Sequence, residues 1–136
     1  MIIGVLALVA AGAMSPCRAA GALAVGEASD GRVWAIVVNA PTIEQAGQAA
    51  RARCRSGSST SERAKALCRI YATFQHQCVA VAAEQDRAGS GFGWALGPNT
   101  AAADYSAQEK CWHSTGRPLG QNSCATKNYL CDGSAK

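Results

Sequence analysis

The spacing of hydrophobic residues changes in the same order in both halves of the chain, between the pattern of a strand and the pattern of a helix. Residues 21–27 (GALAVGE) and 78–84 (CVAVAAE) are short runs of small and β-branched side chains, and each ends in a glutamate. Such runs, bounded by turn residues, are typical of strands. After a turn, each half continues with a second predicted strand, which contains Trp34 or Trp94 followed by alanine. Each half therefore begins with a predicted hairpin.

A stretch rich in alanine follows each hairpin and has the period of a helix. Small residues recur there at every fourth position, which places them on one helix face and lets the helix lie close against a sheet. The residues with this spacing are Ala46, Ala50 and Cys54 in the first half and Ala103, Ala107 and Cys111 in the second. Thr42 with Gln45 forms a predicted capping box at the first helix, and Thr100 is the predicted N-cap of the second.

Each helix is followed by a polar loop and a third predicted strand, at residues 68–74 (CRIYATF) and 124–130 (CATKNYL). The chain thus contains a β-β-α-β unit twice, at about residues 21–77 and 78–131. We expect an α+β fold in which two pseudo-symmetric repeats form an antiparallel sheet with two packed helices, stabilised by disulfides.

The N-terminus predicts export. The first 14 residues carry no charged side chain and are mostly aliphatic. This run is shorter than the roughly 20 residues that cross a bilayer and suits a signal peptide. We expect residues 1–19 to be removed, together with Cys17, leaving a single domain over residues 20–136 that is secreted or periplasmic and has no membrane span.

Removal of Cys17 leaves six cysteines, an even number that is typical of a disulfide framework in an exported chain. The repeat predicts the pairing. In each unit one bond joins the last turn of the helix to the start of the next strand, and the two cysteines that end the units are left to pair near the pseudo-twofold axis. The predicted bonds are Cys54–Cys68, Cys111–Cys124 and Cys78–Cys131.

A glycine-rich stretch at residues 89–97 (GSGFGWALG) raises the question of a phosphate-binding loop. In a dinucleotide fingerprint that starts at Gly91 and Gly93, the third glycine would fall on Leu96, and no Gly-Lys pair of a P-loop occurs in the sequence. We therefore expect a structural role in the hairpin, with no bound cofactor.

Few residues suggest catalysis or metal binding. His76 and His113 lie near Cys78 and Cys111, but those cysteines would be oxidised after export and unable to bind zinc. Glu27 and Glu84 occupy equivalent positions in the two units, and we expect them to be solvated strand ends. The alternative is that they serve a secreted enzyme of unrecognised type, for example one acting on cell-wall polymers.

Charge gives a weaker indication. The net charge is +4, and it becomes +3 when Arg18 leaves with the signal peptide, since 12 basic and 9 acidic residues then remain. A basic cluster suggests an anionic surface or nucleic acid, but its cations also suit the C-terminal end of a helix, and we favour that interpretation. The cluster consists of Arg51, Arg53, Arg55, Arg63, Lys65 and Arg69.

Several of these motifs together are similar to a known family. The GALAV strand, the Gly-rich approach to tryptophan, the Ala-rich helix ending in cysteine and the segment leading into CVAVA resemble the exported bacterial domain of unknown function numbered 4189. The resemblance covers about residues 21–131. It implies export and small size, and it carries no catalytic residues to transfer.

The three tryptophans and Tyr129 suggest where the protein could bind a partner. Trp34 and Trp94 match by repeat and are expected in the core, whereas Trp112 has no counterpart. With Arg117 and Tyr129 it is the predicted partner surface. We expect a small exported, non-catalytic module that binds another protein, such as an inhibitor or immunity partner of an envelope enzyme or a host-interaction factor.

Overall fold

The computed structural model describes residues 19–58, 61–85, 91–118 and 123–136, so the predicted signal peptide lies outside it except for its last residue. Each unit contains three strands and a long helix, as the repeat predicts. The first unit consists of β1 (Ala20–Ala28), β2 (Gly31–Ala40), α1 (Ile43–Arg55), a short α2 (Glu62–Ala66) and β3 (Arg69–Phe74). The second consists of β4 (Cys78–Glu84), β5 (Phe92–Gly97), α3 (Thr100–Thr115) and β6 (Cys124–Cys131).

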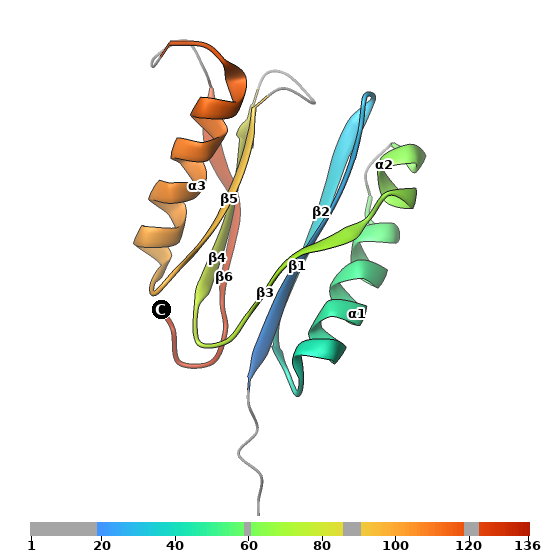
Figure 1. Cartoon of the computed structure of the whole chain (residues 1–136), viewed down its shortest axis with the longest axis vertical. Helices are drawn as coiled ribbons and strands as arrows, with labels where there is room; N and C mark the ends of the chain where they lie inside the picture. Colours follow the sequence, from blue (N-terminus) through green and yellow to red (C-terminus); the bar gives the residue numbers. More distant parts are fainter. Residues whose placement is uncertain (1–18, 59–60, 86–90, 119–122) are drawn as a thin grey trace, which may run out of the picture.

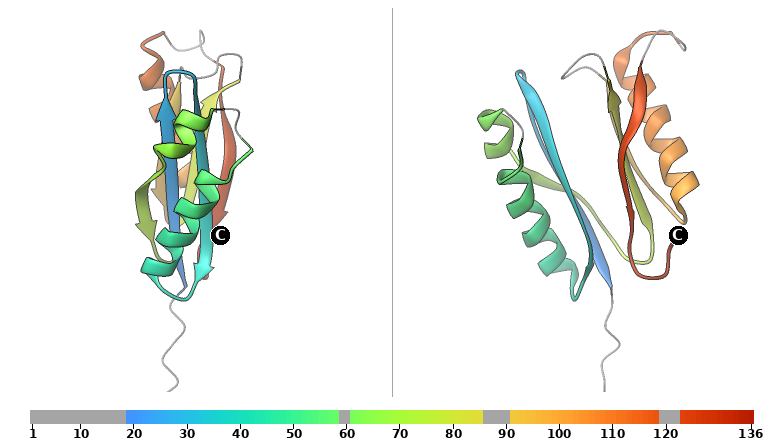
Figure 2. Two further views of the ribbon diagram at one scale, coloured as in Figure 1. Left: turned by 90° about the vertical axis from the view of Figure 1, so that its right-hand side faces the viewer. Right: turned by 180° about the vertical axis from the view of Figure 1, so that it is seen from behind.

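The strands form two antiparallel sheets of three strands each, in the orders β2-β1-β3 and β5-β4-β6. The α+β class and the β-β-α-β repeat are confirmed, and each unit builds its own sheet. The two sheets lie between the helices, with α1 outside one sheet and α3 outside the other (Figures 1 and 2). The molecule thus has four layers.

The central strands explain this layering, because both faces of each are apolar. In β1 the small residues Ala22 and Ala24 face α1, whereas Leu23 and Val25 face the other sheet, and all four are fully buried. β4 repeats the pattern, with alanines towards α3 and valines towards the first sheet. A strand covered on both faces requires a helix on one side and a second sheet on the other.

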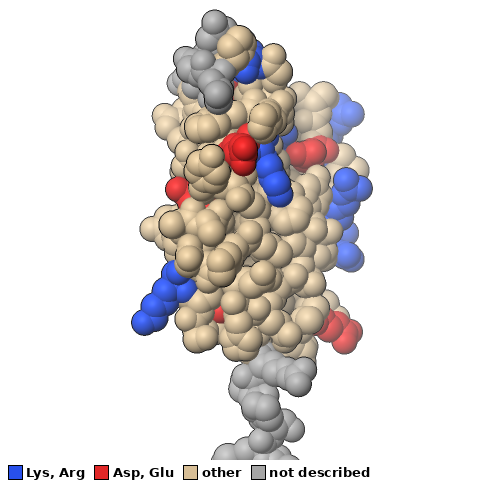
Figure 3. All heavy atoms as spheres, turned by 60° about the vertical axis from the view of Figure 1, so that its left-hand side comes forward, with Lys and Arg blue, Asp and Glu red and all other residues tan. Residues whose placement is uncertain are grey.

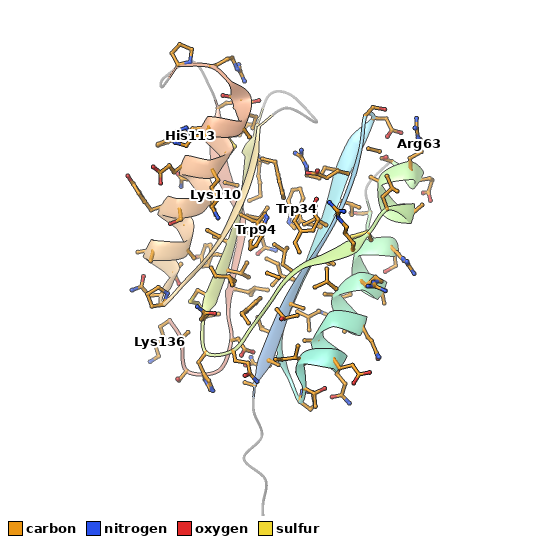
Figure 4. All side chains as sticks on the ribbon, viewed as in Figure 1. Trp34, Arg63, Trp94, Lys110, His113 and Lys136 are labelled. Atoms are coloured by element: carbon orange, nitrogen blue, oxygen red, sulfur yellow. A yellow bond between two sulfur atoms is a disulfide. The ribbon has the colours of Figure 1, made fainter. Side chains whose placement is uncertain are left out.

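Aromatic side chains complete the layer between the sheets. Trp34 and Trp94 point into this layer from opposite sheets (Figure 4) and pack against its buried core, which confirms their expected place. The ring centroids of Trp34 and Phe92 are 6.0 Å apart, and those of Tyr71 and Trp94 are 6.2 Å apart. These pairs join the first sheet to the second.

The glycine-rich stretch is structural in the part that the structure describes. Gly93 and Gly97 face α3, and a Cβ on Gly93 would overlap the carbonyl oxygen of Ala107. The alternate residues Phe92 and Trp94 face the first sheet. Glycine at these positions lets α3 lie directly on β5.

Helix starts agree with the sequence prediction in one unit and correct it in the other. Thr42 caps α1, because its Oγ1 accepts from the backbone N–H of Gln45 at 3.1 Å. The cap of α3 is Asn99, whose Oδ1 accepts from the N–H of Ala102 at 2.9 Å, so Thr100 is the first helical residue and the predicted cap is wrong. The helix α2, capped by Ser61, lies in a segment that was expected to be a loop.

Three disulfides brace the fold, and all three predicted pairs are confirmed. The equivalent bonds Cys54–Cys68 and Cys111–Cys124 each span a Cα–Cα distance of 6.0 Å. The Cys78–Cys131 bond joins the first and last strands of the second unit.

Candidate functional site

In the predicted partner surface, Trp112 and Arg117 lie at the same end of α3, whereas Tyr129 lies on another element. Trp112 is half-buried on α3, and Tyr129 on β6 is 55 % exposed. Arg117 lies beyond the end of α3 and forms an ion pair with Glu84, whose side chain is 1 % exposed. Tyr129 pairs in register with Ala80, four residues along β4 from Glu84, which corresponds to about 13 Å. Tyr129 therefore lies well away along the sheet from the end at which Arg117 contacts Glu84.

The two equivalent glutamates lie in different surroundings. Glu27 is exposed, as expected, and pairs with Arg32 at 2.7 Å across the β1–β2 hairpin. Glu84 is buried, so its expected solvation is wrong. Its Oε2 accepts from the backbone N–H of Gly91 at 2.9 Å, and Arg117 neutralises its charge. Glu84 therefore fastens the end of the second unit's hairpin to the segment after α3.

The histidines lie apart in the fold. His76 occupies the turn between β3 and β4, and His113 is an exposed residue near the end of α3, 3.9 Å from Glu109. Among the described residues, no three of the side chains that commonly bind metals come close enough together to hold an ion. All six cysteines of the domain are oxidised.

Asp132 has the burial and the hydrogen bonds that are typical of a functional residue, and no pattern in the sequence pointed to it. It is fully buried and accepts two backbone hydrogen bonds, from Asn39 at 2.7 Å and from His76 at 3.3 Å. Both donors have positive φ, 57° for Asn39 and 52° for His76. Since its oxygens are directed at backbone groups, Asp132 holds two turns in place, and this role is structural.

A groove of about 450 Å³ lies between α1 and β3 on the outer face of the first sheet. From α1 it is lined by Glu44, Gly47, Arg51 and Arg55 among others, and from β3 by Ile70 and Thr73. A Cβ added at Gly47 would lie 3.8 Å from Ile70 Cγ1, which is an ordinary van der Waals contact. Nothing in the packing therefore requires glycine at this position.

In the second unit, side chains fill the position that is equivalent to the groove. Alignment of the units on their cysteines makes Gly47, Arg51 and Ile70 equivalent to Asp104, Gln108 and Thr126. Gln108 Nε2 donates to Thr126 Oγ1 at 3.0 Å, and the Thr126 hydroxyl donates to Asp104. These side chains bridge α3 to β6, whereas the equivalent positions of the first unit line a groove.

Cations surround the groove. Arg51, Arg53 and Arg55 are exposed on α1, and Arg63 projects from α2 (Figure 4). Two acids lie on the same helices, Glu44 at the start of α1 and Glu62, which pairs with Lys65 at 2.8 Å. In the view of Figure 3, lysine and arginine side chains lie along the upper part of the right-hand edge, with an acidic side chain below them.

The fold and its disulfides define the class of this protein. It is an α+β domain of two units whose disulfides are typical of an oxidising compartment. The family model described as domain of unknown function (DUF4189) matches residues 20–131, and the chain belongs to this family. The resemblance seen in the sequence motifs is thereby confirmed. Comparison with curated proteins and with solved structures found no match. Within the described residues, no helix has the length and apolar character needed to span a bilayer.

Proposed function

We propose that the protein is an exported, non-catalytic module that binds another protein through the groove between α1 and β3. The observation that supports this is the difference between the two units. At equivalent positions the second unit joins helix to strand by side-chain hydrogen bonds, and the first unit has a groove with exposed arginines. At these positions the first unit lacks the side-chain bridge of the second unit and has an accessible surface instead.

The groove has the composition of a protein-binding surface. Ile43 at its rim is 44 % exposed, and Ile70 beside it is half-buried, so a partner would remove apolar area from water. Arg51 and Arg55 supply directional donors around that apolar contact, and arginine is enriched in interfaces. Roles that fit are an inhibitor or immunity partner of an envelope enzyme and a host-interaction factor.

An affinity capture with matched variants tests this proposal. Gly47→Asp fills the groove as Asp104 does in the second unit, and Asn128→Asp makes the same change of charge on the exposed face of β6. We expect Asn128→Asp to capture the same partner from envelope or host extract as the original protein, and Gly47→Asp to lose it. Equal capture by both variants would contradict a role for the groove.

Enzymatic use of Glu27 and Glu84 is the weaker alternative. Glu84 is buried against Arg117, and Glu27 already pairs with Arg32. Each carboxylate therefore has a cation and would have to give it up to act on a substrate. We retain secreted enzymes acting on cell-wall polymers only as the alternative class.

Export to the periplasm or the medium is part of the proposal. The six cysteines of the described domain are all paired, which favours a compartment that oxidises thiols. We expect the intact mass of the exported form to correspond to a chain that begins near Ala20 and lacks Cys17. A mass that includes Cys17, with or without attached lipid, would refute this cleavage.

A further inference from the structure

We propose that the partner contributes an extended, acidic segment that adds to the free edge of β3 as a fourth strand of the first sheet. This inference rests on the proposed function and specifies the chemistry of the partner. It follows from three features of the same place: a strand edge that pairs with no other described strand, hollows on both faces of that edge, and a groove on one face whose two arginines exceed its one acid.

The uncovered edge provides the backbone contacts. β3 pairs with β1 on one side and is the outer strand of its sheet. An edge strand directs alternate backbone N–H and C=O groups away from its neighbour, and an extended peptide can pair with them. α1 packs mainly on β1 and β2, so it leaves this edge accessible. The strand has six residues, which sets the length of the segment that can pair with it.

Hollows lie on both faces of this edge. The groove described above lies on the α1 side, next to Ile70 and Thr73. A second hollow of about 290 Å³ lies on the side of the other sheet. Its lining is Val25, Glu27, Leu67, Arg69 and Tyr71, and the Glu27 carboxylate is already paired with Arg32. Side chains of a strand point alternately to its two faces. In β3 this alternation is interrupted at Tyr71, which has no partner in the register with β1, so Ile70 and Thr73 line the same groove although they are three residues apart. A strand added to β3 would direct its own successive side chains to the two faces, and therefore towards the two hollows.

The two hollows differ in chemistry, and this sets the pattern of the segment. On the α1 side Arg51 and Arg55 lie one helical turn apart, which suits acidic side chains at alternate positions. On the other side Leu67 is 57 % exposed, and the Tyr71 ring lies under the Arg69 guanidinium at 5.3 Å. Apolar side chains fit there. The expected segment alternates acidic and apolar residues.

Charge also argues against a second copy of this chain as the occupant. Edge-to-edge pairing of two β3 strands would bring together two surfaces that each carry Arg51, Arg55 and Arg69 against Glu27 and Glu44, and the excess of like charge across such an interface is repulsive. An acidic partner strand converts the same cations into ion pairs. The surface therefore favours a different chain of opposite charge.

The test uses a decapeptide in which glutamate alternates with valine, and the full oxidised domain. Three control ligands accompany it: the same peptide with lysine in place of glutamate, the glutamate peptide N-methylated at alternate residues, and oligothymidylate. Affinity is measured by calorimetry, and protection of the β3 amides is measured by hydrogen exchange.

We expect the glutamate peptide to bind about tenfold or more tightly than each control and to protect amides in β3. Gly47→Asp should weaken its binding by about tenfold, whereas Asn128→Asp, on the exposed face of β6 away from the groove, should leave it unchanged. Thermal unfolding of each variant shows that the domain is folded.

Four results would overturn the inference. Equal binding of the N-methylated peptide would exclude strand addition, and equal binding of the lysine peptide would exclude an acidic preference. Tighter binding of oligothymidylate, sensitive to Gly47→Asp, would assign the groove to nucleic acid. Absence of peptide binding at millimolar concentration would exclude this class of ligand. If capture of a partner still depends on Gly47 in any of these cases, the proposed function stands and only this inference fails.

Discussion

At the scale of single residues, glycine serves opposite purposes in the two units. Gly93 is required by packing, because α3 lies so close to β5 that a Cβ would overlap the Ala107 carbonyl oxygen. Gly47 lies in the interior of α1, and a Cβ there would rest in ordinary contact with Ile70. The first glycine permits close packing, whereas the second leaves a groove unfilled and weakens its helix.

This contrast predicts opposite effects of the same substitution. Gly47→Ala should stabilise the domain by about 1 kcal/mol, since alanine has the higher helix propensity and fits the available space. Gly93→Ala should destabilise it by about 3 kcal/mol, because the helix must move away from the sheet. Denaturant unfolding of the oxidised proteins measures both changes. If the two substitutions shift the midpoint in the same direction, the assignment of the two glycines is wrong.

The residues that the sequence did not reveal are those whose role depends on distant partners. Asp132 looks like an ordinary turn residue, and only the fold brings the backbone N–H groups of Asn39 and His76 to it. Glu84 occupies a strand end that resembles the position of Glu27, and its burial depends on Arg117. The sequence alone does not show which residues will lie next to these two side chains in the fold, so it contains no signal for either role.

At the scale of elements, periodicity was informative because each strand and helix has one dominant pattern. Six strands, two long helices and three disulfides of the described domain could be predicted from two repeated units. The division into two sheets could not, because the pattern of a strand shows that both faces are covered and does not show what covers them. The groove was missed for a related reason, since it depends on the space between α1 and β3.

The disulfides also belong to this scale, and their removal should have graded effects. Cys54–Cys68 closes a loop with a sequence separation of 14, and Cys78–Cys131 closes one of 53. In the chain-entropy model these correspond to about 3 and about 4 kcal/mol of stability. We expect paired Cys→Ala variants to lose stability in this order, as measured by denaturant unfolding. A larger loss at Cys54–Cys68 would show that local packing outweighs the entropy of the longer loop.

At the scale of the whole molecule, the described residues join the two units in two places. The layer between the sheets buries Leu23 and Val25 of the first unit against Val79 and Val81 of the second. Asp132 provides the other connection, because it lies after β6 and receives hydrogen bonds from the end of β2 and from the turn between β3 and β4. Gly133 adds a bond from its N–H to Asn39 Oδ1 at 3.0 Å.

This arrangement predicts that Asp132 is more important for stability than other acids of the domain. Asp132→Ala leaves the N–H groups of Asn39 and His76 without their acceptor and should destabilise the domain by about 2–4 kcal/mol. Asp132→Asn keeps one acceptor oxygen and should lose about 1–2 kcal/mol. The exposed control Glu109→Gln should change stability by no more than about 0.5 kcal/mol. Denaturant unfolding gives these values, and hydrogen exchange at Asn39 and His76 shows whether the loss begins at the junction of the units. Unaltered exchange at both amides in Asp132→Ala would mean that the turns hold their conformation without the carboxylate, and that the Asp132 side chain does not hold the junction of the units together.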